Sequence, residues 1–215
     1  MVYSNLVGNS KHRNYIVLLV MAFVLTSLLG LSWFGYSYYK NKSEQAASQE
    51  FAKIAQEYSK KIHLNNKDDL NDIEHILKAA AQKHKNSKLY PLFLSYQAET
   101  LLKQNKYKEA AEIFDTIVNS VKQNDPLYYA YSIKRALLKL DSKDTQLESQ
   151  GYDELKGLAN NVNNPLQDMA IYNLGLNEFF KSNKDKAKEL WQTIINKDKQ
   201  DSSWYNLAKS RLESL

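Results

Sequence analysis

A near-repeat close to the C-terminal end constrains the fold more than any other feature of this sequence. Residues 171–175 (Ile-Tyr-Asn-Leu-Gly) reappear in similar form at 204–208 (Trp-Tyr-Asn-Leu-Ala), 33 residues further along the chain. Self-similarity at a fixed period of this length is typical of proteins in which one supersecondary unit stacks on the next copy. We therefore expect an array of stacked units in this part of the chain.

The apolar pattern indicates that these units are helical. Beyond Lys42 the apolar residues recur at spacings of three and four, and no sustained alternation of the strand kind occurs. A first helix is predicted over residues 43–62, with Phe51, Ile54, Ala55 and Tyr58 on one stripe. Short polar breaks, such as 124–126 and 163–165, separate the later helices. The pattern predicts an array of antiparallel helical hairpins.

The spacing of small residues resembles that of the tetratricopeptide repeat. In that repeat, glycine or alanine stands where the two helices of a pair cross closely. One good unit carries Leu94, Leu101, Tyr107 and Phe114, another carries Leu174 and Trp191, and a middle unit is interrupted by a polar insertion at 141–150. A last helix over 202–215 is expected to close the stack. The predicted close-contact positions are Ala98, Ala110, Gly175, Ala187 and Ala208.

The N-terminal part predicts a membrane anchor. No charged side chain occurs from Asn14 to Tyr39, and an apolar run of roughly 20 residues is enough to cross a bilayer as a helix. Aromatic residues from Trp33 to Tyr39, followed by Lys40 and Lys42, are typical of a membrane interface. A cleaved signal peptide is the alternative, but small residues that suit cleavage are lacking where the apolar run ends. We therefore favour a retained transmembrane helix.

These patterns predict an all-α protein. Its expected parts are a short basic tail (1–14), a single transmembrane helix (15–39), a juxtamembrane helix (40–65) and a helical-repeat domain (66–215). The last part is an α-solenoid of about three degenerate tetratricopeptide-like helix pairs with a capping helix. The short basic tail favours a cytoplasmic N-terminus, although charges on the two sides of the span are nearly balanced.

The whole layout resembles the ancillary SecYEG translocon subunit family, a bacterial family with one inner-membrane span and a tetratricopeptide-like periplasmic domain. The exit of the predicted span, Trp33-Phe34-Gly35-Tyr36 with Lys40, is similar to that of the family. The resemblance implies a periplasmic C-terminal domain and a scaffold or chaperone role beside the Sec translocon. Its implied partners are the translocon, a membrane-anchored periplasmic chaperone and exported client chains. A membrane-anchored adaptor in another envelope assembly or division complex is the alternative.

Residues suited to catalysis or metal binding show no recognisable pattern. The chain has no cysteine, and its four histidines lack ligand-like spacing. Acidic residues at 68, 69, 72 and 74 stand where a helix is expected to begin, and negative charge there complements the helix dipole. The chain has a net charge of +5, but its basic residues are mixed with acidic ones along the sequence. A nucleic-acid binder usually gathers its basic residues in one stripe. We expect no enzyme activity, cofactor, metal or nucleic-acid partner.

Partner binding is expected on the inner face of the array, which the first helix of each pair lines. An aromatic face of this kind suits an apolar peptide, because aromatic side chains give a large contact area at low entropy cost. The alternatives are that the helix over residues 43–62, or a second copy of the chain, fills this face. The inner-face candidates are Ser95, Glu99, Tyr129, Ile133, Tyr172, Leu176, Phe179 and Tyr205.

Overall fold

The computed structural model describes the backbone of residues 4–61, 66–197 and 202–215, and side chains except those of residues 4–20, 22, 24 and 67. Every regular element in these ranges is an α-helix. The chain divides into two compact units, residues 1–50 and 51–215, and each is considered by itself. The all-helical architecture agrees with the predicted α-solenoid class.

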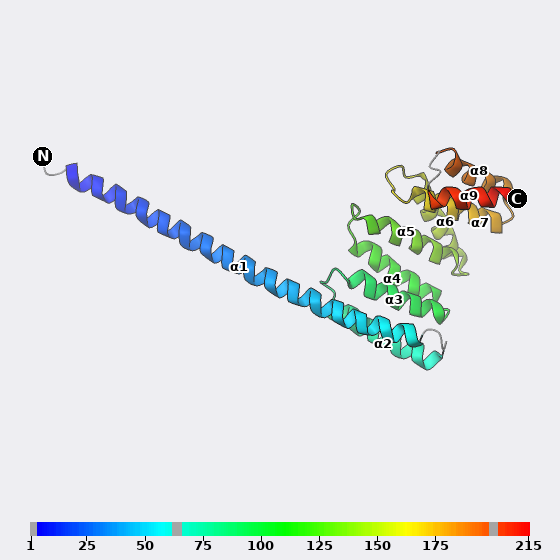
Figure 1. Cartoon of the computed structure of the whole chain (residues 1–215), viewed down its shortest axis with the longest axis horizontal. Helices are drawn as coiled ribbons and strands as arrows, with labels where there is room; N and C mark the ends of the chain where they lie inside the picture. Colours follow the sequence, from blue (N-terminus) through cyan, green and yellow to red (C-terminus); the bar gives the residue numbers. More distant parts are fainter. Residues whose placement is uncertain (1–3, 62–65, 198–201) are drawn as a thin grey trace. The chain divides into compact units, whose positions relative to one another are not determined.

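Helix α1, Ser4–Lys61, runs without a break through the segments predicted as a transmembrane and a juxtamembrane helix (Figure 1). Among the residues whose side chains are described, no helix combines the length and hydrophobicity that crossing a membrane requires. The predicted span over 15–39 thus gains no support here. Residues 15–20, 22 and 24 of that span lie outside the described side chains, and the span stays a prediction.

From α2 onward, the second unit is a succession of helices in which each packs on the next along the chain (Figure 1). Helix α9 contacts both α8 and α7, as a terminal helix that covers the end of the array would. The helices of this unit after α1 are α2 (Lys67–Lys83), α3 (Tyr90–Lys103), α4 (Tyr107–Ser120), α5 (Pro126–Leu140), α6 (Thr145–Asn160), α7 (Gln167–Phe180), α8 (Lys184–Ile195) and α9 (Ser203–Glu213).

The turns inside two of the hairpins have the same geometry. Asn105 between α3 and α4 has φ 60°, and Ser182 between α7 and α8 has φ 65°. In each turn the next amide, Lys106 N or Asn183 N, donates to a carbonyl five residues back at 2.9 Å. This is the hydrogen bond of a helix that ends in a left-handed residue. The two hairpins with the best repeat pattern therefore also share the turn that sets their helices antiparallel.

The middle hairpin corrects one detail of the sequence analysis. The polar segment predicted as an insertion at 141–150 consists of a turn over 141–144 and the first turns of α6. Asp144 starts the helix, since its carboxylate accepts from the amides of Gln146 at 2.9 Å and Leu147 at 3.1 Å. An N-cap of this kind stabilises a helix even where its side chains are polar. The insertion therefore lengthens α6.

Small residues allow the paired helices to approach closely. Ala98, Ala110, Ala187 and Ala208 are all fully buried. At Gly175, a Cβ atom would lie 2.9 Å from two atoms of the Trp191 ring, closer than side chains pack. The Trp191 indole N–H also donates to the backbone carbonyl of Tyr172 at 3.2 Å. Trp191 thus lies directly against the backbone of α7.

Gly151 provides the equivalent close contact in the middle hairpin. A Cβ atom there would lie 2.6 Å from the carbonyl oxygen of Ala136 and 2.8 Å from the amide nitrogen of Leu140, both in the backbone of α5. Backbone atoms cannot move aside as the end of a long side chain can. Helix α6 can therefore approach α5 this closely only if residue 151 is glycine.

Replacement of Gly151 by alanine should separate α5 from α6. We expect Gly151→Ala to lower the free energy of unfolding by about 1–3 kcal/mol, the usual cost of overpacking. The matched control is Gly157→Ala in the same helix, where a Cβ atom would have no neighbour within 4 Å. It should raise stability by about 0.5–1 kcal/mol, since glycine disfavours helix interiors. Denaturant unfolding measures both, and equal effects of the two substitutions would contradict this packing.

Candidate functional site

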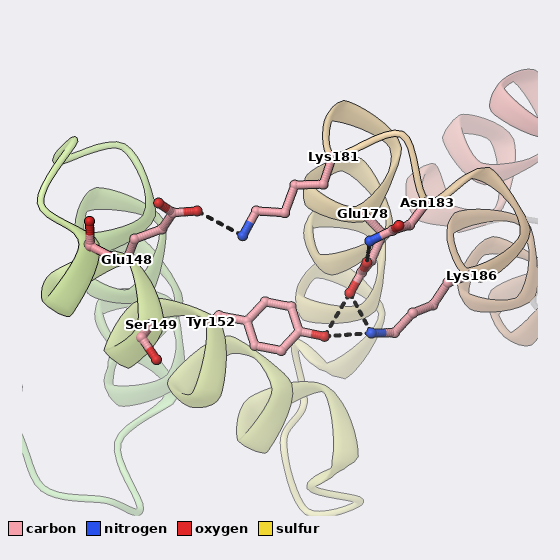
Figure 2. Close-up of a pocket in the computed structure, with 8 residues that line it drawn as sticks. Glu148, Ser149, Tyr152, Glu178, Lys181, Asn183 and Lys186 are labelled. Atoms are coloured by element: carbon pink, nitrogen blue, oxygen red, sulfur yellow. Dashed lines mark hydrogen bonds and ion pairs between the residues drawn. The ribbon is translucent and has the colours of Figure 1, made fainter.

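A polar pocket of about 410 Å³ lies where α6, α7 and the start of α8 meet (Figure 2). Charged and hydroxyl side chains dominate its wall, and the two lysines that line it are about half exposed. A pocket of this size is within the range that small ligands occupy. Its lining residues are Thr145, Glu148, Ser149, Tyr152, Glu178, Lys181, Asn183 and Lys186.

Glu178 is the centre of the hydrogen bonds in this pocket, and its side chain is only 2% exposed. Its carboxylate accepts from the Tyr152 hydroxyl at 2.6 Å, from Lys186 Nζ at 2.6 Å and from Asn183 Nδ2 at 2.8 Å. Lys186 Nζ also donates to the Tyr152 hydroxyl oxygen at 2.7 Å, which closes a triangle of contacts (Figure 2). The buried carboxylate is therefore fully paired, as a buried charge must be.

The same contacts fix the protonation states of the pocket. Burial raises the pKa of Glu178, but hydrogen bonds from Lys186, Tyr152 and Asn183 and the charge of Lys186 outweigh it and lower the pKa to about 2. Hydrogen bonds to Glu178 and Tyr152 raise the pKa of Lys186 above its ordinary value. Neither group exchanges a proton near neutral pH, so the pair does not suit acid–base catalysis. The arrangement fits an electrostatic clamp between α6, α7 and α8.

A second charged cluster joins α4, α5 and α6. Lys139 on α5, whose side chain is 7% exposed, lies 2.7 Å from Glu154 on α6 and 3.4 Å from Asp115 on α4. Arg135, one turn earlier on α5, bonds the same two carboxylates at 2.9 Å and 3.3 Å. Two positive and two negative groups thus balance. Both α5 and α7 hold a buried charge that is paired by the helices on either side.

The structure places the predicted inner-face residues in different environments. Ile133 is fully buried and Tyr172 is 7% exposed, so both belong to the core. Tyr172 is held there by Trp204, 5.6 Å away between ring centroids, and by Arg211 Nε, which donates to its hydroxyl at 3.4 Å. Leu176 and Phe179 are partly buried against the same core.

The remaining inner-face candidates keep some accessible surface or pair with neighbours. Tyr129 and Tyr205 are half-buried, whereas Ser95 is buried and donates to the carbonyl of Pro91 at 2.8 Å. Glu99 is half-exposed and bonds Lys134 Nζ at 2.6 Å. The candidates therefore do not form one continuous accessible strip. The aromatic candidates that are only half-buried are Tyr129, Phe179 and Tyr205.

Within the second unit, the last turns of α1 cover part of α3. The Phe51 ring packs edge-on against Phe93 at 5.2 Å and Tyr96 at 5.1 Å, and Tyr58 lies 4.9 Å from Tyr96. Burial, followed by the negative charge of Glu99, raises the pKa of Tyr58 to about 12. The last turns of α1, from Phe51 to Lys61, therefore pack on α3 through aromatic contacts with Phe93 and Tyr96. The prediction that the helix over 43–62 fills the inner face of the whole array stays a prediction.

Sequence reasoning missed the residues of the buried clusters. Glu178 is the only charged residue in the stretch 174–180, and a lone charge on the buried face of a helix signals a paired carboxylate. Its partners Tyr152 and Lys186 come from other helices, and no local pattern connects them. Gly151, inside a polar segment, was likewise overlooked.

In the part of the chain that is described, no three His, Asp or Glu side chains form a group that could hold a metal ion. His84 is buried and stacks on Phe93 with ring centroids 5.6 Å apart, and His75 is exposed. His12 and His63 lie outside the residues whose side chains are described. The histidines that can be placed therefore serve packing or face solvent.

Comparison with known proteins adds no family assignment: no family model matches the chain, and no curated protein matches it significantly.

The Glu178 clamp predicts a pH-dependent stability difference. Glu178 has a pKa near 2 in the fold against an ordinary 4.5, so its contribution is complete above pH 4.5 and disappears as the pH falls toward 2. We expect Glu178→Gln to lower the free energy of unfolding by roughly 1.5–3 kcal/mol at pH 7, typical of hydrogen bonds to charged groups. That difference should shrink progressively below pH 4.5.

Glu148→Gln is the matched control, because Glu148 pairs with Lys181 at 2.7 Å in the same pocket but is 37% exposed. Exposed ion pairs contribute little, so this variant should unfold almost as the parent does. Denaturant unfolding at a series of pH values gives both curves. A Glu178→Gln deficit that stays constant down to pH 2 would show that the carboxylate is not held ionised.

Proposed function

We propose that this chain is a membrane-tethered helical-repeat protein that acts by binding other proteins. The observation that carries the proposal is the stacked helical array of residues 51–215, in which the buried charges pair with one another between helices. A stack of this kind gives each helix a fixed position and leaves its outer side chains free to contact a partner. Repeat folds usually act through such surfaces.

The tether is proposed from the apolar surface of α1. Its side chains from Met21 to Tyr39 include a nearly continuous set of large apolar and aromatic groups that are more than half exposed, among them Phe23, Leu29 and Trp33. Soluble proteins rarely leave so extended an apolar surface uncovered. Lys40, whose ammonium lies 6.0 Å from the Tyr36 ring centroid, stands where the apolar surface ends. This order of residues suits a helix whose apolar surface lies in a lipid bilayer.

The proposed partner follows from the resemblance in layout to the ancillary SecYEG translocon subunits. On that proposal the C-terminal domain lies in the periplasm, beside the Sec channel and a membrane-anchored chaperone, and assists exported chains. Tethering would raise the effective concentration of the array toward chains that emerge at the membrane. The layout of one apolar helix followed by a helical-repeat domain supports this arrangement.

Crosslinking in bacterial membranes tests the proposal. The full-length chain, with a photocrosslinking residue at Tyr205, should resist extraction by carbonate and form crosslinks to Sec channel subunits. Protease added to spheroplasts should digest the region beyond Lys42, and mass spectrometry should recover peptides from residues 1–13. Crosslinks to division or envelope-assembly proteins instead would favour the alternative partners. Release by carbonate, or the absence of any protein crosslink, would contradict the proposal.

A further inference from the structure

A second pocket, of about 290 Å³, lies between α5 and α6 and contains side chains that the charged clusters do not use. It sits at the start of α5 and the end of α6, beside the connection from α4. Its volume is near the lower end of ligand pockets, about 300–1,000 Å³, and suits a side chain with its flanking backbone. Its lining residues are Gln123, Tyr128, Tyr129, Ser132, Arg135, Glu154, Gly157, Leu158 and Asn161.

Ser132 gives this pocket an unsatisfied polar group. The residue is 2% exposed, and its hydroxyl has no hydrogen-bond partner in the described part of the chain. A buried serine in a helix can bond a carbonyl of the preceding turn, as Ser95 does with Pro91 at 2.8 Å. A buried hydroxyl without a partner is unfavourable, and each such case needs a reason. A ligand group in the pocket would supply the missing hydrogen bond.

Gly157 provides an independent observation at the same place. It lies inside α6, where glycine is unfavourable compared with alanine because of its backbone freedom. Packing explains Gly151 of the same helix, but around Gly157 a Cβ atom would find nothing within 4 Å. The absence of a side chain therefore leaves the backbone of α6 bare toward the pocket. Close approach of a ligand to backbone is one of the uses of glycine.

The charges around the pocket indicate an uncharged ligand. Arg135 and Glu154 bond each other at 2.9 Å, and Asp115 and Lys139 complete a balanced set of charges. The other polar groups are the hydroxyls of Tyr128 and Tyr129 and the amides of Gln123 and Asn161. Hydroxyl and amide groups both donate and accept, so they suit a ligand group that does the same.

The lining also indicates that the ligand is a peptide. The rings of Tyr128 and Tyr129 stand perpendicular at 5.4 Å and give rigid, amphipathic contact area. Tyrosine together with serine, glycine and asparagine is the composition with which antibody loops recognise protein surfaces. A charged small molecule would find no uncompensated opposite charge here, and a large cofactor would exceed the volume.

We propose that the α5–α6 pocket binds an uncharged segment of a partner protein, with an amide or hydroxyl group of that segment paired to Ser132. The proposal rests on the proposed function as a protein-binding module and deepens it by naming the site. The proposed binding site is therefore the pocket beside Tyr129 and not the predicted inner face as a whole, because Ile133 and Tyr172 of that face belong to the core. The segment crosses α6 at Gly157, where its backbone or a small side chain touches the bare helix.

Peptide pools that differ only in charge test the site on the full-length chain in detergent. A neutral pool of short peptides containing Asn, Gln, Ser and Thr is compared with pools in which those positions are acidic or basic. We expect retention of the neutral pool, and retention weaker by about tenfold or more in Ser132→Ala, which removes the proposed hydrogen bond to the ligand, and in Gly157→Leu, which fills the pocket. Lys156→Leu, exposed on the same helix, is the control and should bind as the parent does.

Thermal unfolding of the same proteins separates binding from folding. Gly157→Leu should unfold at a higher temperature than the parent, because leucine favours a helix interior over glycine and a Cβ atom at this position has no neighbour within 4 Å. Lost binding together with raised stability supports the site. Preference for a charged pool, unchanged binding in Gly157→Leu, or no retention of any pool would overturn it. Membrane crosslinks that persist in Gly157→Leu would leave the proposed function intact and overturn only this site, whereas their absence from the parent would overturn both.

Discussion

The contact between Trp191 and the backbone of α7 is the interaction on which the C-terminal half of the array depends. The N–H edge of the indole can approach α7 this closely only because Gly175 has no side chain, and the indole N–H donates to the carbonyl of Tyr172. Tyr172 in turn packs against Trp204 at the start of α9. One ring therefore sets the spacing of α7 and α8 and, through Tyr172, the position of the terminal helix. The core cluster of this region collects around it.

Paired charges extend the same packing from one hairpin to the next. Glu178 on α7 is bonded from α6 by Tyr152 and from α8 by Lys186, while Lys139 on α5 is bonded by Asp115 and Glu154. Loss of one partner from a buried ion pair is strongly destabilising, because it leaves the other charge buried and uncompensated. The clusters therefore favour one arrangement of neighbouring hairpins. Because their charges are used internally, uncharged groups such as Ser132 and the bare backbone at Gly157 remain for binding.

The repeat pattern predicted the helical class and the paired helices around Ala98 and Gly175, because close helix crossings demand small residues at fixed spacings. It was less informative about α6, since the cap at Asp144 allows a polar segment to be helical. The inner-face assignment placed Tyr172 on an accessible concave face of the array. Tyr172 instead fills the space between Trp191 and Trp204, which only the packing of three helices reveals. Ser132 carries no sequence signal, because its environment depends on α5 and α6 together.

A double-mutant cycle between Gly175 and Trp191 tests the central packing claim most directly. Gly175→Ala alone should lower the free energy of unfolding by about 1–3 kcal/mol, because the new methyl group meets the indole. In a chain that already carries Trp191→Leu, the same alanine should cost close to nothing, which gives a coupling energy of about 0.5–3 kcal/mol. Denaturant unfolding of the four proteins measures this coupling. Strictly additive effects would show that Trp191 does not lie on Gly175 and would contradict the account.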